Sequence, residues 1–137
     1  MTTYVDSSVL LRIALGEADP LSEWAAIRPV SSELIRVDCL RAMERLRVQG
    51  LIDEEAVAHR RAGILDTLTR FLLIEPSRVI LERAAEPFPV NVATLDALHL
   101  ATALELRADH PDLTFATHDA KLALAARAVG FTVIGSG

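Results

Sequence analysis

Cysteine, lysine and aromatic residues are few in this chain, and it has no long apolar run. Cys39 is its only cysteine, which excludes an internal disulfide framework and fits a reducing compartment. No stretch approaches the roughly 18 consecutive apolar residues that a membrane helix needs. The first residues have neither a basic flank nor an apolar segment, so we expect no signal peptide and no membrane partner. Together these absences predict a cytoplasmic protein.

Basic residues are fewer than acidic ones, 14 against 19, which gives a formal net charge of −5. Proteins that bind nucleic acid through bulk electrostatics usually carry a basic field, so this balance argues against that class. It leaves room for a nuclease that holds RNA along a local strip of arginines and uses acids to bind metal. Aromatic residues make up only 4% of the chain, too few for a platform on which single-stranded RNA would stack.

The rest of the composition is that of a globular protein. The 137 residues, 51% of them hydrophobic and 24% charged, suffice for a buried core. No repeat or linker interrupts the chain, so we expect a single domain over residues 1–137. Apolar runs predict strands at 2–5, 71–74, 113–116 and 131–134, with a short extended segment at 29–31. Helices are expected at about 8–15, 20–27, 32–50, 54–70, 77–85, 95–107 and 117–129.

The order of these segments indicates the fold class. Strands that alternate with helices form a parallel sheet with helices on both faces. The strand-like runs show little alternation of polar and apolar residues, which is typical of strands covered on both sides. The fold class is therefore α/β. Small polar residues are expected to cap the helices, namely Ser7 or Ser8 the first, Asp19 the second, Asp53 the fourth and Thr94 the one beginning near 95.

Three aspartates fall at strand ends or helix starts. Asp6 follows the first strand, and Asp119 follows the strand at 113–116. Asp96 lies in the first turn of the helix that begins near Thr94. Ligands of open α/β sheets bind outside the carboxyl ends of the strands, and Mg²⁺ prefers oxygen ligands. Any one of these acids could be an ordinary helix cap, so it is their recurrence at one sheet edge that predicts a metal site.

Four segments resemble the sequence motifs of PIN-domain proteins. Residues 4–10, Tyr-Val-Asp-Ser-Ser-Val-Leu, resemble the opening motif, a strand that ends in Asp followed by Ser or Thr. Residues 94–103 are similar to the third motif, an Asp that opens an Ala-rich helix, and residues 115–122 to the fourth, Thr or Ser, any residue, then Asp. Residues 32–42 resemble the second, an acid followed by an aliphatic residue and an Arg-Ala pair. No single motif is specific, but the four occur in the family's order and spacing. The length, element order and compactness of the chain look most like VapC-type toxins of bacterial toxin–antitoxin pairs.

The resemblance implies a fold, an activity and partners. The fold is a three-layer PIN-like α/β fold, with a central parallel five-stranded sheet flanked by helices. The activity is that of an endoribonuclease that depends on Mg²⁺, for which Mn²⁺ substitutes, and that hydrolyses RNA phosphodiesters. The partners are the RNA substrate, a second copy in a homodimer, and a cognate antitoxin whose tail covers the acidic cleft.

The resemblance also implies a metal-binding and catalytic set. Asp6, Asp96 and Asp119 match three of the family's acids directly. The second acid of the family is usually Glu, whereas the matching position here is Asp38, with Glu33 as a nearby rival. Asp is one methylene shorter than Glu, so the metal either lies closer to this helix or is contacted through water. The predicted set is Asp6, Asp38, Asp96 and Asp119.

Helix geometry favours Asp38 over Glu33. At about 100° per residue the two positions lie roughly 140° apart, so they cannot both face one cleft. Asp38 lies at the edge of the apolar face that includes Ile35 and Cys39, whereas Glu33 shares a face with Arg36. Val37 and Leu40 lie on the side of Glu33, so that both sides of this helix could be covered.

Hydroxyl and guanidinium groups supply further candidates. Ser8 and Thr117 match small hydroxyl positions of the family, where they would support the acids or contact the scissile phosphate, although a plain helix cap is the simpler role for Ser8. Arginines could contact the RNA backbone. The candidates are Arg41, Arg45, Arg60 and Arg61.

Other protein classes fit the sequence less well. A phosphoryl-transfer receiver domain needs paired acids after its first strand, but Ser7 and Ser8 follow Asp6. A haloacid-dehalogenase-like phosphatase needs an Asp where Ser8 stands. The four histidines form no zinc-binding pattern, and for His99 and His118 a core or solvated position is the simpler interpretation. A catalytically silent PIN-like module that binds RNA or an antitoxin remains an open alternative.

Overall fold

A computed structural model describes residues 1–136, so that Gly137 of the expected domain lies outside the described residues. Five strands form one sheet, all of whose pairings are parallel, in the order β3-β2-β1-β4-β5. The strands are β1 (Thr2–Val5), β2 (Arg28–Ser32), β3 (Leu72–Ile74), β4 (Thr114–Ala116) and β5 (Val133–Ile134). The predicted α/β class and the five-stranded parallel sheet are therefore confirmed.

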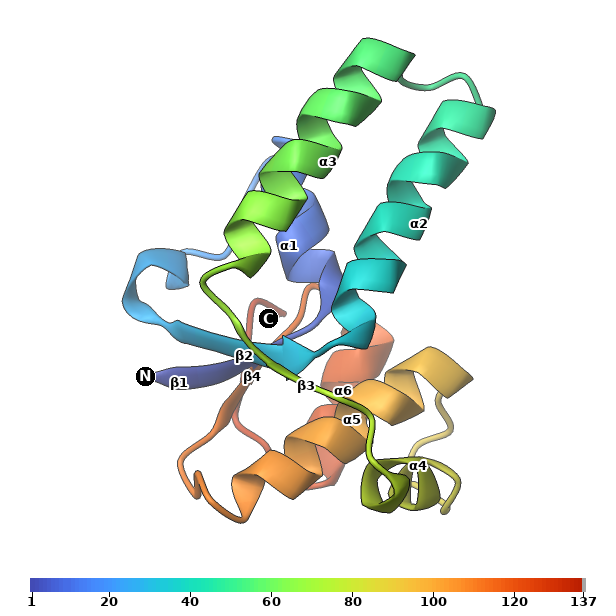
Figure 1. The fold of residues 1–137 in the computed structure, drawn as a ribbon. Helices are drawn as coiled ribbons and strands as arrows, with labels where there is room; N and C mark the ends of the chain where they lie inside the picture. The colour runs from blue at the N-terminus through green and yellow to red at the C-terminus, as the bar shows by residue number, and fades with distance from the viewer. Residues whose placement is uncertain (137) are drawn as a thin grey trace.

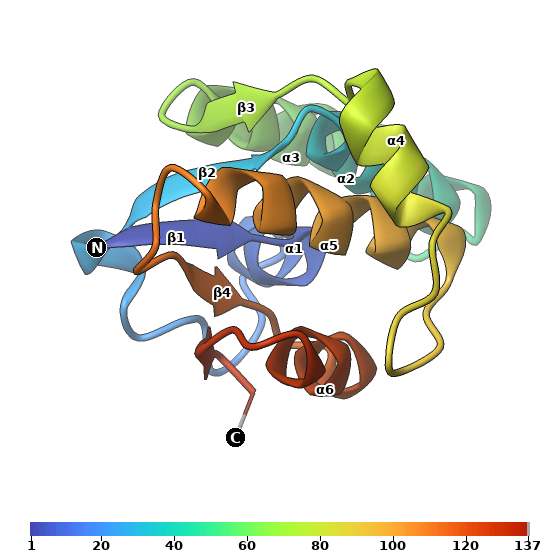
Figure 2. The same ribbon diagram turned by 90° about the horizontal axis from the view of Figure 1, so that it is seen from below.

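Helices cover both faces of the sheet, which gives three layers (Figure 1). They are α1 (Ser7–Ala14), α2 (Leu34–Val48), α3 (Glu54–Leu68), α4 (Arg78–Ala84), α5 (Thr94–Arg107) and α6 (Ala120–Ala128). The first three lie on one face, where α2 and α3 form a hairpin that extends beyond the sheet (Figure 1). The last three lie on the other, as the view from below shows (Figure 2). No helix within the described chain is long and apolar enough to span a membrane.

Each face of the sheet has its own hydrophobic core. Successive residues of a strand point to opposite faces, so the fully buried Tyr4 and Val5 of β1 belong to different cores. Val5 packs in the cluster that contains residues of α1, α2 and α3. Tyr4 packs with Leu100 of α5 and Leu122 of α6. The pattern continues past the strand, which directs Asp6 toward the same side as Tyr4.

The prediction of a helix at 20–27 is wrong. Only a short 3-10 helix, η1 (Trp24–Ala26), forms there. Asp19 has a φ of 55°, a left-handed conformation that differs from the extended backbone of a helix cap. The segment instead buries Leu21 and Ile27 on either side of η1, because the chain must turn back to begin β2.

Of the three other expected helix caps, two differ in the structure and one is confirmed in detail. The side chain of Asp53 accepts a hydrogen bond from the amide of Ala56 at 2.7 Å, as a cap of α3 should. Thr94 is the first residue of α5 rather than its cap. Asp6, not Ser7 or Ser8, occupies the cap position of α1, and its side chain makes no capping bond. The serine hydroxyls near this end are therefore available for another role.

The topology brings the ends of two strands together. β1 is central and pairs with β4, with Val5 opposite Ala116. The amide of Asp6 donates to the carbonyl of Ala116 at 3.2 Å, which extends this pairing by one step. The segments that follow β1 and β4 therefore leave the sheet side by side.

Candidate active site

A partly buried network of hydroxyls joins the segments that follow β1 and β4. Asp6 is only 4% exposed, and its carboxylate accepts a hydrogen bond from Ser8 Oγ at 2.7 Å. The same Ser8 oxygen accepts from the amide of His118 at 2.9 Å and lies 3.3 Å from Thr117 Oγ1. Ser8 therefore supports Asp6 and ties it to the end of β4, so the expectation of a plain helix cap for Ser8 is wrong.

Asp119 is held at the N-terminus of α6. Its Oδ1 accepts from the amides of Lys121 at 2.9 Å and Leu122 at 3.1 Å, while its own amide donates to Thr117 Oγ1 at 3.0 Å. The helix expected from 117 accordingly begins at Ala120, with Asp119 as its cap. Free amides and the helix dipole both favour an anion at this position. Asp119 is exposed, so its second carboxylate oxygen remains available to a ligand.

Burial makes Asp6 an unusual carboxylate. Loss of solvent raises the pKa of Asp6 to about 7, although hydrogen bonding from Ser8 and Thr117 opposes this rise. The negative charge of Asp96 contributes to the same increase. A buried carboxyl group with a strongly raised pKa is a feature of functional sites.

The charges of neighbouring acids affect the pKa of Asp96. This residue lies in the first turn of α5 and is half-buried. Burial, followed by the charges of Asp119 and Asp38, raises the pKa of Asp96, and the charge of Lys121 opposes them. Asp96 is therefore subject to repulsion from Asp119 and Asp38, and Asp6 to repulsion from Asp96, at the carboxyl edge of the sheet. Bringing a divalent cation to this edge would relieve the repulsion.

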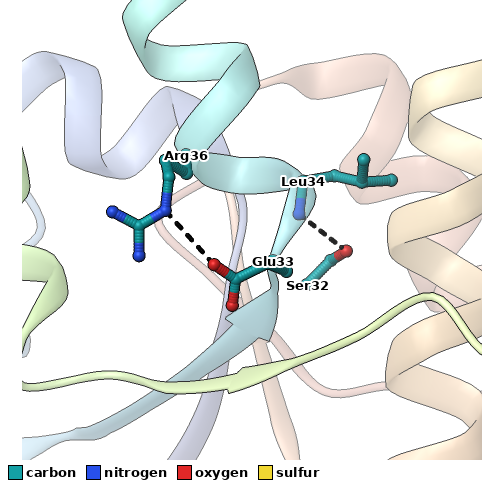
Figure 3. Close-up of polar contacts among 4 residues, drawn as sticks. All are labelled: Ser32, Glu33, Leu34 and Arg36. Carbon is teal, nitrogen blue, oxygen red and sulfur yellow. Dashed lines mark hydrogen bonds and ion pairs between the residues drawn. The ribbon is translucent and has the colours of Figure 1, made fainter.

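Glu33 and Asp38 have different surroundings on α2. Glu33 stands just before the helix and pairs through Oε1 with Arg36 Nε at 3.2 Å (Figure 3). Beside it, Ser32 Oγ accepts from the amide of Leu34 at 3.1 Å and so starts the helix (Figure 3). Asp38 is half-buried and raises the pKa of both Asp96 and Cys39. The carboxylate that interacts with the other acids is therefore Asp38, while Glu33 is neutralised by a neighbour.

The arginine candidates divide into exposed and anchored side chains. Arg41, Arg45 and Arg61 are exposed, and the first two line a small cleft on α2. The Arg60 guanidinium donates to the carbonyl of Ala14, so it joins α3 to α1 and is not free for a ligand.

The donor chemistry of the four acids fits a hard divalent cation. Carboxylate oxygens are the ligands that Mg²⁺ takes in proteins, and the raised pKa of Asp6 shows that its charge is poorly compensated. In the described part of the chain, no three carboxylate, histidine or cysteine side chains already surround a common point as a metal cluster. Mg²⁺ binds through one or two carboxylates and keeps several waters, so it does not need such a cage.

One contact in the core next to the acids, that between Tyr4 and His99, was not predicted from the sequence. Tyr4 Oη lies 2.6 Å from His99 Nδ1, and both side chains are buried. The spacing of these two residues from the acids in the sequence could have predicted it. Tyr4 precedes Asp6 by two residues on a strand, and His99 follows Asp96 by three on a helix, so each shares a face with an acid.

Comparisons with known proteins agree with this architecture. A model of the PIN domain family matches residues 3–134. The chain is 34% identical over 135 residues to Ribonuclease VapC46 of Mycobacterium tuberculosis strain H37Rv, covering 96% of this chain and 95% of that protein. It is 28% identical over 137 residues to Ribonuclease VapC47 of Mycobacterium tuberculosis strain CDC 1551, covering 98% and 96%.

A solved structure has the same fold. One chain of a toxin–antitoxin complex from Klebsiella pneumoniae superposes with a TM-score of 0.62 at 17% identity, covering 96% of this chain and 95% of that one. The chain described here thus belongs to the PIN-domain family. Its extended similarity to VapC proteins makes it a VapC-type member, as the four sequence motifs predict.

Proposed function

We propose that this chain is a metal-dependent endoribonuclease that acts as the toxin of a toxin–antitoxin pair. The observation that carries the proposal is the placement of acids at the carboxyl edge of the sheet. Asp6 and Asp119 follow the paired strands β1 and β4, and Asp96 lies in the first turn of α5, where the charges of Asp119 and Asp38 raise its pKa. The names of its relatives support an activity on RNA. Four carboxylates at one edge of the sheet would bind the metal ions that assist hydrolysis of a phosphodiester.

The four acids are the groups that would hold Mg²⁺, for which Mn²⁺ substitutes. A divalent cation supplies a more acidic bound water and neutralises charge on the phosphoryl oxygens. Asp6 and Asp119 are oriented before any ligand arrives, the first by the Ser8 hydroxyl and the second by two amides of α6. Such preorganisation lowers the cost of fixing the ligands when they bind.

The remaining candidates act on the substrate. Arg41 and Arg45 follow Asp38 along α2 at intervals that place them on its side of the helix, where they would contact the RNA backbone. Guanidinium groups suit this task because they bind phosphate oxygens in pairs. Thr117 is fully buried and bonded to the amide of Asp119, so it supports the acids rather than the phosphate.

The proposal includes two protein partners. An antitoxin would cover the acidic edge with a segment of opposite charge, because exposed Asp119 and half-buried Asp96 attract cations. A second copy of the chain would form a homodimer. The structural neighbour comes from a toxin–antitoxin complex, which supports the first of these partners.

A cleavage assay with controlled metal tests the proposed activity. Protein treated with a chelator should leave RNA intact, and addition of Mg²⁺ or Mn²⁺ should restore cleavage. RNA binding without cleavage at any metal concentration would indicate the silent binding module instead. Sequencing of the RNA ends formed after brief induction in cells would identify the substrate.

A further inference from the structure

The contact between Tyr4 and His99 joins two elements that each lead to a site acid. Tyr4 lies on β1, two residues before Asp6, and His99 lies on α5, three residues after Asp96. Tyr4 Oη and His99 Nδ1 are 2.6 Å apart, and the two side chains are almost completely buried. The hydrogen bond is therefore one layer below the acids and spans the same two elements.

The same hydroxyl also reaches the element that leads to the third acid. The amide of Ser32, the last residue of β2, donates to Tyr4 Oη at 3.1 Å. The chain enters α2 two residues later and reaches Asp38 within the first turns of that helix. Tyr4 Oη thus lies where the segments that bear Asp6, Asp38 and Asp96 meet.

Tyr4 Oη takes part in hydrogen bonds from two sides. A backbone amide can only donate, so Tyr4 Oη accepts from Ser32, and it shares a second hydrogen bond with His99 Nδ1. Burial lowers the pKa of His99 to about 4, so the ring is neutral near pH 7. Within residues 1–136 the buried Nε2 of His99 has no hydrogen-bond partner.

Aromatic packing surrounds the hydrogen bond. The Tyr4 and His99 rings meet edge to face with centroids 5.7 Å apart. The ring of Phe115 stacks on Tyr4, with centroids 5.2 Å apart and an interplanar angle of 20°. Tyr4 is therefore held by two kinds of contact, and only the hydrogen bond joins its hydroxyl group to α5.

We propose that Tyr4 and His99 are positioning residues, whose hydrogen bond sets the spacing of Asp6, Asp38 and Asp96 and thereby the affinity of the site for divalent metal. This inference rests on the proposed function, because it assumes that these acids bind metal. In this role neither side chain would contact metal or RNA, because both are buried. Removing a partner that orients metal ligands typically weakens metal binding by about 10–100-fold.

The test measures Mn²⁺ affinity by electron paramagnetic resonance on the purified full chain, well below its melting temperature. Tyr4→Phe and His99→Leu each remove one partner of the hydrogen bond, and both should weaken Mn²⁺ binding by about tenfold. His99→Asn retains an acceptor near the position of Nδ1 and should bind almost as the parent chain does. A purely structural role would lower the melting temperature of all three and leave the affinity of the folded protein unchanged.

Phe115→Leu is the matched control, because it loosens the packing around the same phenol and retains the hydrogen bond. It should reduce the melting temperature without changing Mn²⁺ affinity. Parent-like affinity of Tyr4→Phe, or an equal loss in Phe115→Leu, would overturn the inference. If Tyr4→Phe does not fold, the Mn²⁺ affinities of His99→Leu and His99→Asn are compared instead. Weaker binding by His99→Leu supports the inference, and equal affinities overturn it. Absence of Mn²⁺ binding by the parent chain would overturn the proposed function itself, and the inference with it.

Discussion

Ser8 Oγ stands between Asp6 and the end of β4, donating to the Asp6 carboxylate at 2.7 Å and accepting from the amide of His118 at 2.9 Å. One hydroxyl thereby stabilises the charge of the most buried acid and joins it to the segment that carries Asp119. This single side chain therefore links two segments from distant parts of the chain, each of which carries one of the acids.

We predict that Ser8→Ala weakens both the fold and the site. The change leaves the His118 amide and the Asp6 carboxylate without this partner, which should reduce the free energy of unfolding by about 1–3 kcal/mol. It should also raise the pKa of Asp6 further, because the Ser8 hydroxyl lowers it. Chemical denaturation and the pH profile of RNA cleavage measure the two effects. Ser7→Ala, one residue earlier in α1, is the control and should behave as the parent chain.

Asp6→Asn and Asp96→Asn should each reduce metal-dependent RNA cleavage by at least about 100-fold. Asn keeps the size of the side chain and, at position 6, an oxygen that accepts from Ser8, so both variants should fold. Cleavage rates at saturating Mg²⁺, together with circular dichroism spectra, check the prediction. Full activity of both variants would contradict the assignment of the metal site.

The two acids of the second motif should differ in effect. Asp38→Asn is expected to reduce cleavage strongly, because Asp38 interacts with Asp96. Glu33→Gln breaks an exposed ion pair with Arg36, a contact of the kind that contributes about 0–1 kcal/mol, and should leave activity nearly unchanged. A single-turnover assay compares the rates, and melting curves should be similar for both. Greater damage from Glu33→Gln would mean that Glu33 is the family's second acid.

Without metal, the contribution of Asp6 to the stability of the fold should decrease as pH rises from about 4 to 7. The pKa of Asp6 is raised from 3.8 to about 7, so between these values the folded state binds a proton that the unfolded state has released. The stability that this proton contributes is fully present below the unfolded pKa and is lost as pH passes the folded one. The raised pKa of Asp96 acts in the same direction, whereas the lowered pKa of His99 acts in the opposite one. Melting temperatures in chelator therefore compare the parent chain with Asp6→Asn, and the parent chain should lose more stability over this pH range than the variant does.

Induction of the protein in cells should arrest growth, and a small partner protein should relieve the arrest. The reason is the proposed ribonuclease activity combined with an acidic edge that a cationic segment can cover. Growth curves with parent and Asp96→Asn chains provide the measurement and its control. Harmless expression of protein that cleaves RNA in vitro would contradict the role of a toxin while leaving the nuclease in place.

Much of the fold followed from local sequence, because strand-length apolar runs and helix starts are local features. Asp6, Asp96 and Asp119 were predicted at the sheet edge for the same reason, and the structure places them at such junctions. The segment at 20–27 could not be predicted correctly, since burial of Leu21 and Ile27 outweighs a local pattern that favours a helix. The family resemblance suggested that Ser8 supports the acids, but the local pattern favoured a plain helix cap, because the contact of Ser8 with Thr117 crosses 109 residues of sequence.

The strand order also has a consequence for the newly synthesised chain. β1 is made first, but one of its two neighbours in the sheet is β4, which lies at residues 114–116. Until the ribosome has passed that point, one edge of β1 is unpaired and Asp119 does not yet exist. An unfinished polypeptide therefore cannot assemble the four acids, and cleavage of RNA during translation of this protein must wait for its last segments to fold.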